Sequence, residues 1–152
     1  MLLPLHRRTP RAAAVLLVLG AALATAAAPP APAAPRQGCT GDGCYQLDPV
    51  EEGCADDAVT VDGASATIGD MRVDLRYSES CRASWAQART TPDLRKILVG
   101  THGASEAQVE YNDLGTKTIY TNMVDGTTAG FVCIYPRRGN PNCGNVVTPS
   151  AR

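Results

Sequence analysis

Alternation of apolar and polar residues is clearest over residues 72–77, where Val73, Leu75 and Tyr77 alternate with charged side chains. A period of two places successive side chains on opposite faces of an extended strand, so we expect this apolar set to face a core. A weaker alternation covers residues 58–61. Further short β-type runs occupy residues 94–99, 107–111, 117–121 and 130–135.

One segment, residues 81–86, fits two kinds of secondary structure. Cys81, Ala83 and Trp85 alternate with Arg82, Ser84 and Ala86, which predicts a strand. Cys81 and Trp85 also stand four residues apart, as neighbours on one face of a helix do. A short helix is therefore the alternative here.

Turn-forming residues separate these runs. Asp62-Gly63 and Asp125-Gly126 are tight-turn signals, and Gly100, Gly115 and Pro136 interrupt the pattern elsewhere. About seven short strands with turns between them, and no long amphipathic helix, are typical of an all-β domain. We expect a small antiparallel barrel or sandwich.

The first residues have the pattern of a secretory leader. Arg7, Arg8 and Arg11 precede an apolar stretch over residues 12–23, and small residues follow over 24–28. This pattern predicts a signal peptide over residues 1–28, because an uncleaved anchor usually needs about 20 apolar residues. A Pro/Ala-rich linker is expected over 29–37 and the β domain over 38–148.

Removing the leader changes the charge of the chain. It takes away three of the 14 basic residues and none of the 15 acidic ones, which leaves a net charge of about −4. Nucleic acid is not expected as a partner, because phosphate contacts need clustered Lys and Arg. No second hydrophobic span follows the leader, so no membrane association is expected after cleavage.

Six cysteines follow the leader. An even number after an export signal predicts three disulfides and a secreted protein, either extracellular or associated with the cell wall. Six cysteines allow fifteen pairings. Proximity in the sequence favours Cys39–Cys44, Cys54–Cys81 and Cys133–Cys143, with pairing of Cys39 or Cys44 to a distant strand as the alternative.

Several spaced motifs lie between the first cysteine and the sixth. They are Cys39-x4-Cys44, Asp48-Pro49, Gly53-Cys54, Asp74-Leu75-Arg76-Tyr77-Ser78, Cys81-x-Ala83-x-Trp85-Ala86 and Tyr120-Thr121-Asn122-Met123-Val124. Together they resemble a domain-of-unknown-function family of secreted proteins from actinomycetes and some Gram-positive relatives. The resemblance implies secretion, but no ligand, activity or catalytic residue comes with it.

Catalytic chemistry has few candidates in this sequence. His102, in Gly100-Thr101-His102-Gly103, could act as a general base, but a solvated turn residue is the simpler interpretation. No Gly-x-Ser-x-Gly element supplies a nucleophile. One histidine after the leader, together with paired cysteines, leaves no usual zinc ligand set. We therefore assign no catalytic residue, metal or cofactor.

The acidic residues between positions 41 and 57 are expected to form a solvated surface. The alternative is a weak cation site that uses Asp48, Glu51 or Asp56, although the spacing is not that of an EF-hand loop. Asp74 and Arg76 are expected to form cross-strand ion pairs rather than to act in glycoside hydrolysis.

The favoured function is a secreted, non-catalytic binding or structural module with an unknown extracellular or cell-wall partner. Trp85 and Tyr77 are expected in the core rather than on a carbohydrate platform. A first alternative is a protease inhibitor, in which a Cys133–Cys143 disulfide would hold a loop that carries Arg137 and Arg138 as binding residues. A second is a hydrolase of an extracellular polymer that uses carboxylates as acid and base.

Overall fold

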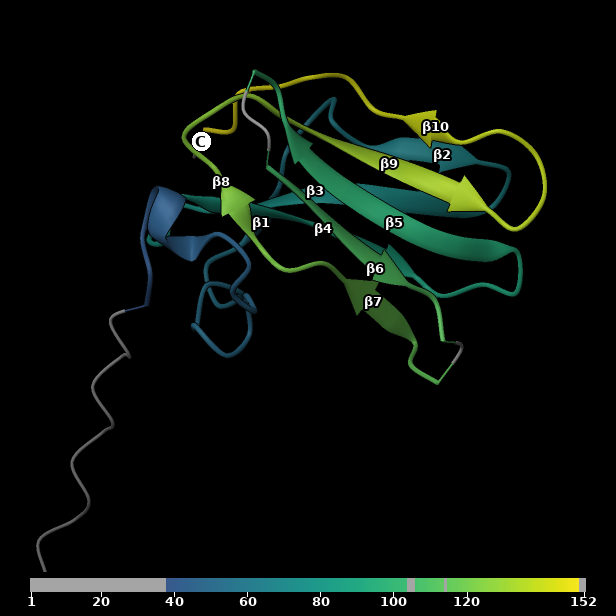
Figure 1. The fold of residues 1–152 in the computed structure, drawn as a ribbon, viewed down its shortest axis with the longest axis horizontal. Helices are drawn as coiled ribbons and strands as arrows, with labels where there is room; N and C mark the ends of the chain where they lie inside the picture. Colours follow the sequence, from purple (N-terminus) through teal and green to yellow (C-terminus); the bar gives the residue numbers. More distant parts are fainter. Residues whose placement is uncertain (1–37, 104–105, 114, 151–152) are drawn as a thin grey trace, which may run out of the picture. The chain divides into compact units, whose positions relative to one another are not determined.

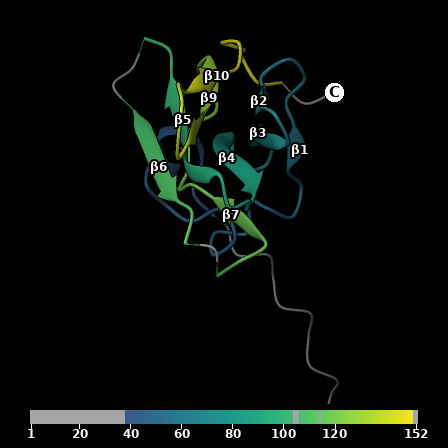
Figure 2. The same ribbon diagram turned by 90° about the vertical axis from the view of Figure 1, so that its right-hand side faces the viewer.

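The computed structural model describes residues 38–103, 106–113 and 115–150. The expected signal peptide over 1–28 and linker over 29–37 lie outside the described residues. The described part consists of two antiparallel sheets that pack face to face, seen from the front in Figure 1 and as two layers in Figure 2. Within it, no helix is long and apolar enough to cross a membrane.

The first sheet has six strands, and its hydrogen-bonded order is β1-β3-β4-β7, with β2 also paired to β3 and β8 to β4. The strands are β1 (Val59–Thr60), β2 (Ala66–Ile68), β3 (Met71–Ser78), β4 (Ala83–Arg89), β7 (Thr118–Tyr120) and β8 (Val124–Asp125). Strand β3 is the one with the clearest alternation. Val73 and Leu75 are fully buried and Arg72 is exposed, as the alternation predicts.

The second sheet has four strands in the order β10-β9-β5-β6. They are β5 (Leu94–Thr101), β6 (Ala107–Tyr111), β9 (Gly130–Pro136) and β10 (Asn142–Cys143). The runs predicted over 94–99, 107–111 and 130–135 correspond to β5, β6 and β9. The runs over 58–61 and 117–121 contain β1 and β7, whereas no predicted run marked β2, β8 and β10, which have two or three residues each.

The main core lies between the two sheets. Leu75 and Val73 of β3 pack in one cluster with Ile97 of β5 and with Val132 and Ile134 of β9, all with no exposed surface. The two sheets do not close into a barrel, so the all-β prediction is confirmed in its sandwich form.

A second, smaller core covers the part of the outer face of the six-stranded sheet around Trp85. The helical alternative for residues 81–86 is wrong, since Ala83–Arg89 is strand β4. Its Trp85 is 2% exposed and packs with Cys44, Cys54 and Met123 beneath the loop that begins with the short 3-10 helix η1 (Gly41–Cys44). Both faces of β4 are therefore buried near Trp85, which confirms its expected place in the core.

All three disulfides join the cysteines that sequence proximity favours. The Cα–Cα distances are 4.9 Å for Cys39–Cys44, 5.7 Å for Cys54–Cys81 and 4.0 Å for Cys133–Cys143. The first two hold the loop over Trp85, and the third joins β9 to β10. The alternative pairing with a distant strand is not found.

The expected cross-strand ion pairs of Asp74 and Arg76 are wrong. Asp74 forms an ion pair with Arg72 on its own strand, with 2.7 Å between Asp74 Oδ1 and Arg72 Nε. The residue opposite Asp74 is Gln87 and the one opposite Arg76 is Trp85, so neither has an opposite charge across the ladder. Arg76 instead donates to Thr60 Oγ1 (2.6 Å) and to the Ala58 carbonyl oxygen (2.7 Å).

The Asp125-Gly126 signal does not mark a hairpin, because β8 pairs with β4 and the following strand β9 pairs with β5. The glycine is needed for a close approach instead. A Cβ atom at Gly126 would lie 2.8 Å from the backbone carbonyl carbon of Ala83. Because β8 and β9 belong to different sheets, the Asp125-Gly126 segment begins the connection from the six-stranded sheet to the four-stranded one.

Candidate functional site

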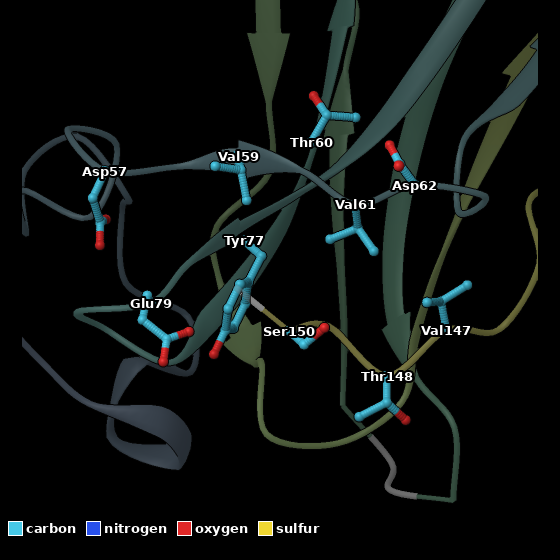
Figure 3. Close-up of a pocket in the computed structure, with 10 residues that line it drawn as sticks. All are labelled: Asp57, Val59, Thr60, Val61, Asp62, Tyr77, Glu79, Val147, Thr148 and Ser150. Atoms are coloured by element: carbon cyan, nitrogen blue, oxygen red, sulfur yellow. The ribbon is translucent and has the colours of Figure 1, made fainter. Parts of the chain in front are cut away.

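A pocket of about 290 Å³ lies beside Tyr77, between β1, the end of β3 and the C-terminal segment. Figure 3 shows the Tyr77 ring and the side chains of Val59, Val61 and Val147 around it, with the Glu79 carboxylate next to the Tyr77 hydroxyl. The hydroxyl groups of Thr148 and Ser150 line the side formed by the C-terminal segment. The site therefore has an apolar wall and a polar rim.

Strand pairing places these side chains. Val59 lies directly opposite Tyr77 in the β1–β3 ladder, and the Val61 N–H donates to the Leu75 carbonyl oxygen at 2.9 Å. Val147 is held by a pair of 2.9 Å backbone hydrogen bonds with Gly130, at the start of β9. Three segments distant in the sequence thus meet at Tyr77.

The electrostatics of the pocket centre on the Tyr77 hydroxyl. Burial raises the pKa of Tyr77 above its ordinary value, and the hydrogen bond with Glu79 and the charge of that carboxylate raise it further, while Arg82 acts in the opposite direction. Tyr77 is therefore a neutral hydroxyl at physiological pH. A ligand in the pocket would meet this hydroxyl together with the Glu79 carboxylate.

Asp57, at the edge of the pocket, has a structural role. Its carboxylate accepts from Ser78 Oγ at 2.5 Å and from the Ser80 N–H at 2.8 Å, which fixes the turn after β3. Burial by itself would raise the pKa of Asp57, but these hydrogen bonds outweigh it and hold the pKa below its ordinary value. This fixed turn contains Glu79 and so positions its carboxylate.

The two arginines predicted as binding residues do not line this pocket. Arg137 and Arg138 are exposed in the loop between β9 and β10, which the Cys133–Cys143 disulfide closes. The Arg137 N–H donates to the Asp93 carbonyl oxygen at 2.7 Å, and its Nε donates to the Pro92 carbonyl oxygen at 2.8 Å. Arg137 is thus fixed to a neighbouring loop.

His102 is exposed, as expected of a solvated turn residue, and does not line the Tyr77 pocket. Glu110 and Asp113 share a hollow of about 220 Å³ with Asp48. Partial burial raises the pKa of Glu110 most, and repulsion from the Asp113 carboxylate adds to this rise. Asp48 Oδ1 accepts hydrogen bonds from the N–H groups of Val50 and Glu51, at 2.7 and 3.2 Å. Glu110 is exposed on β6, so this hollow does not shield a carboxylate pair from water, and we assign no acid–base role to it.

Among the described residues, one group of side chains has the spacing of potential metal ligands. Cys39, Cys44 and Cys54 bring their sulfur atoms within 4.8 Å of one another, and all three are disulfide-bonded. A thiolate is the form of cysteine that binds metal, so the bonded sulfurs are not a zinc site.

Sequence reasoning missed the Tyr77 pocket as a site. It predicted Tyr77 on the buried face of β3 and a weak strand near Val59, which together form one wall. The opposite side comes from residues 147–150, a segment without periodic alternation that carried no signal. The assembly of the pocket depends on the Gly130–Val147 bridge, which pairs residues 17 positions apart.

A family model matches residues 39–133, which include the first two disulfides, Trp85 and Tyr77 but end before Cys143 and the C-terminal side of the pocket. Neither a curated protein nor a solved structure matches the chain. The matched region covers more than half of the 152 residues. The chain therefore belongs to the family described as protein of unknown function (DUF2690).

Proposed function

We propose that the chain is a secreted, non-catalytic binding module and that the Tyr77 pocket holds its ligand. The observation that carries this proposal is a pocket of about 290 Å³ with an apolar wall and a few polar groups at its rim. Small-molecule sites have this composition, in which the apolar surface supplies affinity and the polar groups fix orientation. Three disulfides support secretion, because such bonds persist in oxidising compartments.

The lining of the pocket selects the chemistry of the ligand. Glu79 contributes a carboxylate beside Tyr77, whereas no Lys or Arg is among the described residues that line the pocket. A negatively charged ligand would lose its hydration without gaining a cationic partner. The ligand is therefore a small molecule with an apolar part for the valine wall and a cationic or neutral polar group for Glu79.

Three probes of one size test this proposal on the oxidised, isotope-labelled mature protein. Benzylamine carries a positive charge, benzyl alcohol none and benzoate a negative charge. NMR titration should shift the amide signals of residues 59–61 and 77–79 most with benzylamine, less with benzyl alcohol and least with benzoate. Glu79→Gln should remove the preference for benzylamine, while Glu51→Gln, outside the pocket, should keep it.

Val59→Ser tests the apolar wall, and the 48% exposure of Val59 makes this change safe for folding. We expect weaker binding of both benzylamine and benzyl alcohol. No localised shift at millimolar concentration of any probe, or strongest binding of benzoate, would contradict the proposed site.

A protease inhibitor is the second candidate function, and the loop between β9 and β10 favours it. The loop is closed by a disulfide and exposes two arginines. Preorganisation of this kind lowers the cost of ordering a loop on binding. Because Arg137 is fixed to residues 92–93, Arg138 is the side chain available to enter the acidic specificity pocket of a trypsin-like protease.

Trypsin inhibition tests this second function. We expect inhibition at micromolar protein that Arg138→Ala abolishes and Arg137→Ala weakens. Arg89→Ala, which removes an exposed arginine on β4, is the matched control and should inhibit like the original protein. Unaltered trypsin activity at micromolar protein would remove this function from consideration.

A further inference from the structure

A long groove crosses the outer face of the six-stranded sheet beside the second core, on the side of β3 opposite to the main core. Two hollows of about 380 and 360 Å³ adjoin there and share Arg76, Gln87 and Thr118 in their linings. The first hollow extends to Arg72 and Arg89, and the second to Val50 in the disulfide loop. Together they form one open channel rather than a compact pocket.

Strand register explains why the lining of the first hollow is mainly polar, while the disulfide loop adds apolar residues to the second. Asp74, Gln87 and Tyr120 lie side by side across β3, β4 and β7, and Arg89 lies opposite Thr118 in the next row. The groove therefore offers hydrogen-bond donors and acceptors at successive positions, together with the partly buried ring of Tyr120. This pattern differs from the apolar wall of the Tyr77 pocket.

Three arginines and two aspartates line the first hollow and leave it with a net positive charge. Arg72 is neutralised by Asp74, but no carboxylate of the described residues forms an ion pair with Arg76 or Arg89. Two hydrogen bonds hold the guanidinium of Arg76 in place, and its buried Nε–H has no hydrogen-bond partner. The buried Nε–H is closed to a ligand, so a carboxylate would meet the Nη hydrogens of Arg76 that these two bonds leave free and the exposed guanidinium of Arg89.

We propose that this groove binds a linear polysaccharide that carries carboxylate groups. The hydroxyl groups of a sugar chain match the alternating donors and acceptors, a sugar ring can stack on Tyr120, and Arg76 and Arg89 pair with the carboxylates. The site is separate from the Tyr77 pocket and does not depend on it.

Other extended partners fit the groove less well. A protein interface needs an apolar centre, whereas the apolar residues of this groove belong mainly to the second hollow, at one end. The β3 side chains in the groove, Arg72, Asp74 and Arg76, are all charged. Nucleic-acid sites need clustered Lys and Arg along the phosphate backbone, and no lysine is among the described residues that line the two hollows.

Calorimetric titration of the full oxidised mature protein with hexagalacturonate, which has a carboxylate on each sugar, tests the proposal. Neutral cellohexaose is the matched probe and hexaglutamate is the acidic peptide probe. We expect hexagalacturonate to bind most tightly and to shift the NMR signals of β3, β4 and β7. Arg89→Gln should weaken its binding about tenfold, as expected for the loss of one charge-assisted contact.

Control variants separate the groove from general charge effects and from the Tyr77 pocket. Arg138→Gln removes an exposed arginine outside the groove, and Val59→Ser alters the pocket, so both should bind hexagalacturonate normally. Gln87→Ala should weaken binding without a loss of charge. Equal weakening by Arg89→Gln and Arg138→Gln, tighter binding of cellohexaose or hexaglutamate, or no binding at millimolar hexagalacturonate would overturn the proposal.

Discussion

Trp85→Ala is expected to lower the free energy of unfolding by about 3–5 kcal/mol, the usual cost of removing a large aromatic side chain from a core. Trp85 is 2% exposed and stands at the centre of the second core, with Met123 and two cysteine side chains around it. Its removal leaves a cavity between β4 and the disulfide loop. The loop cannot collapse freely to fill that cavity, because Cys39–Cys44 and Cys54–Cys81 restrain it.

Urea unfolding followed by far-UV circular dichroism measures this effect, since the variant lacks the only tryptophan of the chain. Val146→Ala is the control, because Val146 is 48% exposed and its truncation should cost less than about 0.5 kcal/mol. Hydrogen exchange should rise in residues 38–57 before it rises in β5 and β9. A loss below 1 kcal/mol would show that the second core contributes little.

Removing the Cys54–Cys81 disulfide by a double replacement with alanine is expected to cost about 3.5 kcal/mol. The bond closes a loop of 27 residues and so restricts the unfolded chain more than Cys39–Cys44, which closes 5. Loss of Cys39–Cys44 should cost about 2 kcal/mol by the same loop-closure argument. Cys54 is also fully buried, so its truncation adds lost packing to the entropic effect.

Urea midpoints of the two double variants measure this order directly. Each variant keeps the other two disulfides, so each serves as the control for the other. Equal losses, or a larger loss for the Cys39–Cys44 variant, would contradict the loop-closure explanation. A larger loss for Cys54–Cys81 would identify this bond as the main covalent support of the loop over Trp85.

Much of the fold could be predicted from local pattern. The alternation in residues 72–77 identified β3 and its buried face, and short apolar runs located β5, β6 and β9. Cysteine proximity gave the three disulfides, because each bond closes a short or moderate loop. These features depend on side chains near one another in the sequence.

Ion pairing and site residues could not be predicted in the same way. Asp74 and Arg76 have the right charges for cross-strand pairs, but the register places Gln87 and Trp85 opposite them. The Tyr77 pocket needs Val147, which reaches it through a backbone bridge to Gly130. Neither fact has a local signature.

The sequence alone thus determined an all-β chain with a buried β3 face and three disulfides, since a period of two and loop closure act over short distances. Tertiary structure alone decided that two sheets stack as an open sandwich, that a disulfide loop covers Trp85, and where the pocket and the groove lie. The physical reason is that strand register and sheet packing are set by contacts between residues far apart in the chain. Such contacts leave no period in the sequence.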